Sequence, residues 1–540
     1  MTSKMATAIS TGRMFFTLAV TALLLSATAA SAAAPGISAG AGTAVTFNLD
    51  AAPAYLTQPD GRMIYSWGYG CGVAPSSPAP GAAPAASAPA AFLPAAIAGA
   101  SCSTMQVPGP TLIVTQGQQV TVNLYNGLPA AAGNTSILFP GFTVAASGGV
   151  AGVLTREAAP GTTVTYTFTA STPGTRAYYS GTQGDLQVEM GLYGAIIVLP
   201  SSIPPECTTG LHASNLTAQA HWGESDFRLA PAAYNHARAC YDREYLFQFS
   251  EIDPGIHLQA DAQVAACGTT AGCKLTVATE PYHPAYFMIN GRSMPDDMDP
   301  NYAPQYAHQP YNGNPHMHPG ELTLVRIIGQ GRWQHPFHEH GNHVRVLARD
   351  GNLILTPDGS ALAGPLLFTT TTTPGLAMDG IFYWTGKGLN WDPYGHNPAS
   401  GDASAKLPCT PDANGYNTGS PTAINYFEWC QDHNKPLEMA PFGDVAGNGP
   451  ATLPDPNLFA NGAWYGGSPY LGPNATGRAV GSTPIPPFGT VANSPSEEAG
   501  FAFMWHSHNE REITTNNIFP GGMLMMMLVD SREFVIDESL

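Results

Sequence analysis

The chain has 540 residues, of which 44% are hydrophobic and 11% are charged, and its formal net charge is −18. A chain of this length can bury the cores of two to three domains. The 59 glycines and 49 prolines predict many turns, which favours an all-β protein over a helical one. The acidic balance excludes binding to nucleic acid or anionic membranes through charge, because both would repel the chain.

The first 32 residues read as a secretory signal peptide. Lys4 and Arg13 precede an apolar run from Met14 to Leu25, and small residues with A-x-A spacing follow at Ala30 to Ala32. A membrane-spanning helix needs about 20 apolar residues, so this run is too short to cross a bilayer. We therefore expect a secreted or periplasmic protein with no membrane span.

Eight cysteines in an exported chain predict disulfides. Their spacing favours pairs between nearest neighbours, and other connectivities stay open. The favoured pairs are Cys71 with Cys102, Cys207 with Cys240, Cys267 with Cys273, and Cys409 with Cys430.

The first half of the mature chain, residues 33–200, shows alternating strand patterns. Apolar residues alternate with polar ones after Val120 and again after Val164, which predicts half-buried antiparallel strands. A Pro- and Ala-rich segment between Cys71 and Cys102 predicts a surface loop. Further strands are expected at Val45–Leu49, Val107–Val114 and Gly191–Leu199.

The second half, residues 201–540, begins another series of strands. Between about 386 and 497 the chain is rich in Gly, Pro and Asn, which predicts a long loop insertion. A separate domain within 201–294 is an alternative, although strand patterns there are few. Strands are expected from Glu244, at Tyr286–Gly291, at Glu321–Ile328 and at Val344–Leu347.

Two stretches of the second half concentrate histidines. Residues 334–343 read Q-H-P-F-H-E-H-G-N-H, and residues 503–523 begin F-M-W-H-S-H. Alternate side chains of a strand share one face, so His338 projects with His340 and His506 with His508. Two such pairs on neighbouring strands would bring four imidazoles together, which predicts a metal site.

At these residues the chain resembles the multicopper oxidases. The last domain of that family carries H-P-x-H-x-H-G, and later H-C-H-x-x-x-H followed by Met or Leu. The resemblance implies tandem cupredoxin-like Greek-key β-sandwich domains with the long loop insertions noted above. It matches the histidine quartet, His338, His340, His506 and His508, to ligands of a copper cluster, and His335 to a ligand of a separate blue copper.

The chain departs from the family pattern at several copper ligands. The thiolate position holds Ser507, the second blue-copper histidine falls on Glu512, and the axial ligand falls on Met523. A neutral hydroxyl binds copper weakly, so the electron entry point is expected to be lost. No histidine precedes His212. The places where the first domain would carry histidines hold Leu138, Pro140, Tyr179 and Gly181.

Three or four neutral imidazoles in the quartet still suit Cu(II), or Zn(II) as an alternative. The other interpretation is a vestigial site whose histidines only hydrogen-bond to one another. A second candidate site combines His335, Glu512 and Met523, with a carboxylate that would favour Mn(II). Against it, a glutamate after a strand usually faces solvent.

Four other features carry smaller expectations. His316 and His318 are expected in a surface turn, and Met523 to Met527 in the packed core of a final strand. Glu339 is a candidate proton donor near the metal, and His343 a residue that orients a ligand.

The sequence therefore predicts a copper-binding relative of the multicopper oxidases without laccase-type turnover, and with no assigned catalytic residue. One alternative is a structural or interaction protein, and another is an oxidoreductase with residual copper-dependent activity. A homo-oligomer such as a trimer is compatible with the sequence, because two-domain relatives of this fold often form trimers.

Overall fold

The computed structural model describes residues 34–71, 91–94, 97, 99–387, 410–423, 425–431, 467–470, 500–530, 532 and 534–538. Within these ranges β-strands dominate, with a few short helices, so the all-β prediction is confirmed. The expected signal peptide, most of the insertion at 386–497 and Cys409 lie outside the described residues. No helix among the described residues is long and apolar enough to cross a membrane.

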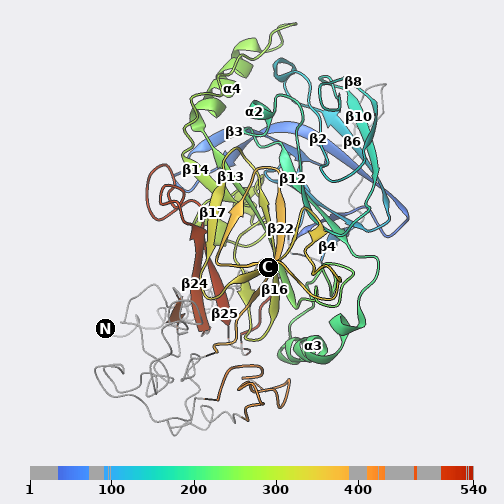
Figure 1. The fold of residues 1–540 in the computed structure, drawn as a ribbon. Helices are drawn as coiled ribbons and strands as arrows, with labels where there is room; N and C mark the ends of the chain where they lie inside the picture. The colour runs from blue at the N-terminus through green and yellow to red at the C-terminus, as the bar shows by residue number, and fades with distance from the viewer. Residues whose placement is uncertain are drawn as a thin grey trace, which may run out of the picture.

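Two five-stranded sheets form the first half of the chain, shown in blue to green in Figure 1. The first has the order β11-β12-β5-β1-β4 and the second β3-β2-β6-β10-β7. A short pair, β8 (Val150–Ala151) and β9 (Arg156–Glu157), lies beside them. The strands of the two sheets are β1 (Gly36–Ser38), β2 (Ala44–Thr57), β3 (Met63–Gly70), β4 (Ala91–Leu93), β5 (Gly109–Thr115), β6 (Gln119–Asn126), β7 (Ala145–Gly148), β10 (Thr163–Thr169), β11 (Gly174–Tyr179) and β12 (Tyr193–Leu199).

The alternation of threonines with apolar residues explains why the sequence T-V-T-Y-T-F-T forms strand β10. Val164, Tyr166 and Phe168 are buried in the core between the two sheets, and the threonines face the other way. The strand pairs antiparallel with β6, which has the same pattern. The predicted half-buried antiparallel strands are therefore confirmed.

The second half builds a seven-stranded and a six-stranded sheet. The seven-stranded sheet has the order β14-β13-β16-β22-β18-β19 with β20 beside β18, and the six-stranded sheet has the order β15-β25-β24-β17-β21 with β23 beside β24. Their strands are β13 (Arg243–Ile252), β14 (Tyr286–Ile289), β15 (His316–Met317), β16 (Leu322–Gly329), β17 (His335–Glu339), β18 (Val344–Arg349), β19 (Asn352–Leu353), β20 (Leu366–Leu367), β21 (Thr369–Thr372), β22 (Ala377–Tyr383), β23 (Gly467–Tyr470), β24 (Gly500–Ser507) and β25 (Leu524–Asp530).

Strand β13 is buried along its whole length because it packs on both sides. Tyr245, Phe247 and Phe249 enter the core shared with the six-stranded sheet, and Leu246 packs against alanines and Ile197 of β11 and β12. The four sheets are therefore stacked, with the six-stranded sheet as an outer layer. Figure 1 shows its strands β24 and β25, in red, at the edge away from β2 and β6.

Among the described residues, three α-helices accompany the sheets: α2 (Gly184–Gln187), α3 (Gly210–Trp222) and α4 (Pro254–Cys267). The Asp253 side chain caps α4 by accepting the backbone N–H of Gly255 at 2.8 Å. Although α4 follows residue 200, its Ile256 and Ala260 pack into the core of the first half. The division of the chain near residue 200 stays a prediction.

Three of the expected disulfides are present: Cys71–Cys102, Cys207–Cys240 and Cys267–Cys273. Cys430 is disulfide-bonded as well, but Cys409 lies outside the described residues.

Candidate metal centre

The histidine quartet gathers on the outer face of the six-stranded sheet. Strands β17 and β24 run antiparallel with His338 directly opposite His506. The ring centroids of His338 lie 4.7 Å from His340, 5.5 Å from His506 and 4.9 Å from His508. The structure thus brings the four predicted residues together.

Two nitrogens of the quartet face each other at the distance that one metal ion would impose. His340 Nε2 and His506 Nε2 are 3.2 Å apart, and two nitrogens bound to one tetrahedral ion lie about 3.3 Å apart when each bond is about 2.0–2.1 Å. The carbonyl of Ser507 accepts a hydrogen bond from Nδ1 of His506 at 2.7 Å, which leaves Nε2 as the nitrogen with a lone pair. The donor set therefore fits a metal that prefers imidazole.

Two histidines of the quartet, His338 and His506, favour the neutral form. Burial, followed by repulsion from His340, His506 and His508, lowers the pKa of His338 to about 4. Burial also lowers the pKa of His506. His338 hydrogen-bonds through Nδ1 with the hydroxyl of Thr369 on β21 at 2.7 Å, which orients its ring.

Thr369 was not among the predicted residues, although the sequence holds a signal for it. Five consecutive threonines, Thr369 to Thr373, end in Pro-Gly, and in a strand alternate threonines of such a run share a face. Thr369 meets His338, whereas the next residue, Thr370, donates its hydroxyl to Glu339 at 2.5 Å on the opposite face.

Glu339 lies on the inner face of β17, because alternation turns it away from His338. It is buried, and burial raises the pKa of its carboxyl to about 8. The expectation that Glu339 gives protons to the metal stays untested, but its side chain leaves the strand on the side away from the quartet. His343 contacts Phe368, with ring centroids 5.1 Å apart.

The second candidate site is an ion-pair network. His335 Nε2 hydrogen-bonds Glu251 at 2.9 Å, and Nδ1 forms an ion pair with Glu512 at 2.9 Å. Burial favours the neutral ring, but the two carboxylates outweigh it and raise the pKa of His335 to about 9. Glu512 is only 1% exposed, so the expectation that it faces solvent is wrong.

Ser507 and Met523 complete this buried network. The Ser507 hydroxyl donates to Glu512 at 2.5 Å, and its backbone N–H donates to the carbonyl of Met523 at 2.9 Å. Met523 packs in the core of the second half with Met525 and Met527, which confirms the expected role of the methionine run. The imidazole that the resemblance matches to a copper ligand is thus paired with two carboxylates.

His316 and His318 are buried, so the expected surface turn is wrong. His316 lies on β15, which pairs in parallel with the last strand, β25. His318 hydrogen-bonds Glu224 at 2.6 Å. The sequence gives no hint of this burial, because the pairing joins segments that are distant along the chain.

Glu224, His318 and Glu321 form a buried group whose ligand atoms lie within 4.8 Å of one another. Arg243 already bridges the two carboxylates through ion pairs with both. Burial opposes ionisation, but Arg243 and His318 hold the pKa of Glu224 below its ordinary value. Both carboxylates therefore have an ion-pair partner within the protein, and the group is a structural ion-pair cluster.

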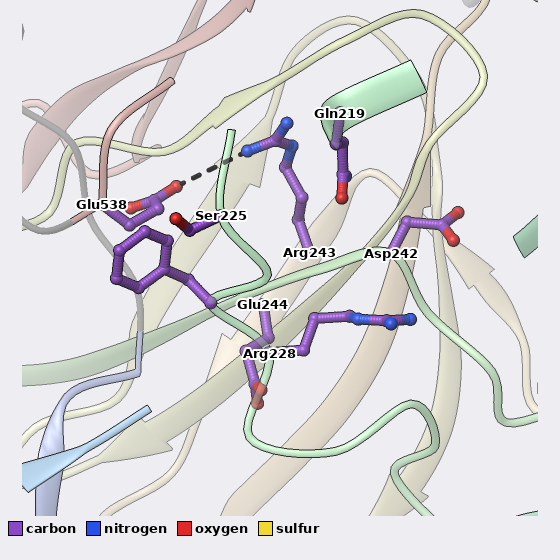
Figure 2. Close-up of a pocket in the computed structure, with 8 residues that line it drawn as sticks. Gln219, Ser225, Arg228, Asp242, Arg243, Glu244 and Glu538 are labelled. Atoms are coloured by element: carbon purple, nitrogen blue, oxygen red, sulfur yellow. Dashed lines mark ion pairs between the residues drawn. The ribbon is translucent and has the colours of Figure 1, made fainter. Parts of the chain in front are cut away.

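Figure 2 shows the small cavity beside this cluster, with Arg243 directed toward Glu538 at 3.9 Å. Arg228 and Glu244 also line it. Its volume is only about 20 Å³, which is room for about one water molecule. This cavity is too small for a substrate.

Comparison with known proteins finds a similar domain for one part of the chain. Residues 100–202 match the sequence model of a multicopper oxidase domain. A curated relative, multicopper oxidase MCE from Talaromyces pinophilus, is 34% identical over 103 residues, which cover 18% of this chain and 16% of the relative. Over these residues the chain is similar to multicopper oxidases.

Two solved structures are also similar to this chain. A blue copper oxidase from Nitrosomonas europaea has 14% identity and a TM-score of 0.41, covering 89% of this chain and 85% of its own. A copper nitrite reductase from the same organism has 17% identity and a TM-score of 0.35, covering 63% of this chain and 84% of its own.

The matched residues, 100–202, contain no histidine. Leu138 and Tyr179 are neighbours there, and the Leu138 N–H donates to the Tyr179 carbonyl at 2.7 Å. Gly181 lies against the Leu138 side chain. These positions line a cavity that none of the quartet residues lines.

Proposed function

We propose that the protein binds one copper ion through His338, His340, His506 and His508 and does not carry out laccase-type oxidation. The observation that carries the proposal is the convergence of four imidazoles, with Nε2 of His340 and His506 3.2 Å apart. Neutral nitrogen donors suit Cu(II). His508 is exposed, so an ion can reach the group from solvent.

The residues around the ion define what the site can do. When bound, copper would supply a redox-active Lewis acid. Thr369 orients the ring of His338, and the Ser507 carbonyl orients that of His506. Loss of laccase-type turnover is supported by the Ser507 hydroxyl, which donates to Glu512, and by the absence of histidine before His212.

The competing function is a structural or interaction protein with a vestigial site. The contact between His340 Nε2 and His506 Nε2 favours it, because two imidazoles can satisfy each other by a hydrogen bond without metal. Metal analysis separates the two functions directly.

The disulfides support export to an oxidising compartment, as the apolar N-terminal run suggests. Exported protein made with copper supplied should therefore be the material for the test. Elemental analysis should find about one copper per chain, and zinc and manganese should be counted in the same samples.

The variant carrying His338→Ala and His506→Ala should lose this copper. The matched control carries His221→Ala and His236→Ala, which remove two histidines outside the quartet, and should keep it. Copper retained by the first variant would contradict the site. Absence of metal from the wild-type protein would favour the structural function. Three or more coppers per chain together with oxygen consumption would show laccase-type oxidation and contradict the proposal.

A further inference from the structure

A cavity of about 290 Å³ lies between the two halves of the chain. Leu138 and the segment from Tyr179 to Gly181 line it from the first half, and Gln330, Gly331, Pro374 and Gly375 from the second. It is far larger than the cavity of about 20 Å³ near Arg243. Because β21 pairs Thr369 with His338 and Thr372 with His335, the Pro374 end of this segment lies away from the quartet.

The lining of the cavity is mainly apolar. Leu138, Leu154, Val188 and Pro374 contribute carbon atoms, and glycines leave space between them. At Gly375 the backbone φ is +78°, and an added Cβ would lie 3.1 Å from the Tyr179 ring. The glycine therefore allows the close approach that shapes the wall beside Tyr179.

Polar groups in the cavity are few. The Ser180 hydroxyl already donates to Gln187 at 2.7 Å, and the Gln330 amide nitrogen donates to Gly194 and Gln248. The Tyr179 hydroxyl makes no hydrogen bond with any group in the described part of the chain. No lining residue carries a charge.

This chemistry selects against water and against ions. A water molecule is held well only by two to four polar partners. An anion would be repelled by a chain with a net charge of −18. An apolar molecule that displaces weakly held water gains free energy. A cavity of about 150 Å³ lined by carbon atoms accommodates benzene, so 290 Å³ has room for about two fused rings.

The cavity is reached across an apolar rim. Leu154 lines it and is 66% exposed, and Leu376, which follows Gly375, is 47% exposed. Large apolar side chains that stay in water near a cavity are typical of a binding site for apolar molecules.

We propose that this cavity binds a neutral, apolar small molecule of one to two rings, with at most one polar group, which would meet the Tyr179 hydroxyl. The site is independent of the metal centre, so its test does not depend on copper. Leu154 at the rim and Leu138 inside the cavity are the residues that decide affinity.

Binding can be measured on the full metal-free chain with the neutral dye 1-aminonaphthalene, which has two fused rings and one polar group and whose emission shifts to the blue in apolar surroundings. Naphthalene should displace it. Leu154→Asp should weaken dye affinity at least tenfold, because it places a charge at the rim. The matched control is Leu258→Asp on α4, where the leucine is 69% exposed and outside the cavity, and its affinity should stay within twofold of wild type.

Leu138→Trp fills the cavity from inside and should also weaken the affinity for the dye at least tenfold. If that variant does not fold, the comparison of dye affinity between Leu154→Asp and Leu258→Asp still tests the proposal. The proposal is overturned if the wild-type protein gives no blue shift of the dye emission, if the two aspartate variants behave alike, or if a folded Leu138→Trp variant binds like wild type.

Discussion

His335 is fully buried and lies between the carboxylates of Glu251 and Glu512. Burying one charge alone would be costly, but the ion pairs offset that cost. Glu251 is further held by the backbone N–H groups of Arg332 and Trp333, at 2.6 and 2.8 Å. At the scale of single residues, a position that the family gives to a metal ligand thus carries a positive charge of its own.

This charge predicts a pH dependence of stability. The pKa of His335 is raised to about 9 in the folded protein, against about 6.5 in the unfolded chain. Its contribution is therefore fully present below about pH 6.5 and is lost as pH rises through about 9. The free energy of unfolding should fall by about 3 kcal/mol over this window, since each pKa unit corresponds to about 1.4 kcal/mol.

The measurement is urea unfolding between pH 6 and 10. The difference in unfolding free energy between wild type and His335→Gln should shrink as pH rises. The exposed control His221→Gln should follow wild type at every pH. A constant difference between wild type and His335→Gln would show that no charge is carried at this position.

Three strands position the quartet at the scale of elements. Strand β17 lies between β21 and β24, so His338 has Thr369 on one side and His506 on the other. Phe337 points inward to Phe249, with ring centroids 4.7 Å apart, and anchors the strand in the core. The outward face of the sheet is then left to the histidines.

Strand β21 provides a matched test of this arrangement. Thr369→Val removes the hydroxyl that orients His338 and should weaken copper binding at least about tenfold, as the loss of such supporting contacts typically does. Thr371→Val makes the same change on an exposed position of the same strand and should leave affinity unchanged. Copper affinity from competition with a chelator is the readout, and equal affinities would remove Thr369 from the site.

The whole molecule is joined by a buried polar contact as well as by apolar packing. Thr175 on β11 donates its hydroxyl to Asp379 on β22 at 2.6 Å, and Tyr234 donates to the same carboxylate at 2.5 Å. Arg326 donates to the Thr175 hydroxyl at 3.0 Å. The sheets of the two halves are therefore held in one orientation, which also shapes the cavity between them.

Removing this contact should loosen the molecule without touching the quartet. Thr175→Val keeps the side-chain shape but leaves buried charged groups short of a partner, and should cost about 1–3 kcal/mol. The unfolding midpoint should fall, while copper stoichiometry stays as in wild type. Thr169→Val, at an exposed position of β10, is the control. An unchanged midpoint for Thr175→Val would mean that the contact contributes nothing to stability.

The sequence alone determined the strands and the faces of the histidines, because alternation with a period of two is a local property of an extended chain. It also predicted, by resemblance, that ligands of the multicopper oxidases are missing at Ser507, Leu138 and Tyr179. Only the tertiary structure decided what replaces those ligands. Glu251 meets His335 from 84 residues away, and the cavity joins residues from both halves. Such contacts depend on how the sheets stack, and local patterns carry no information about stacking.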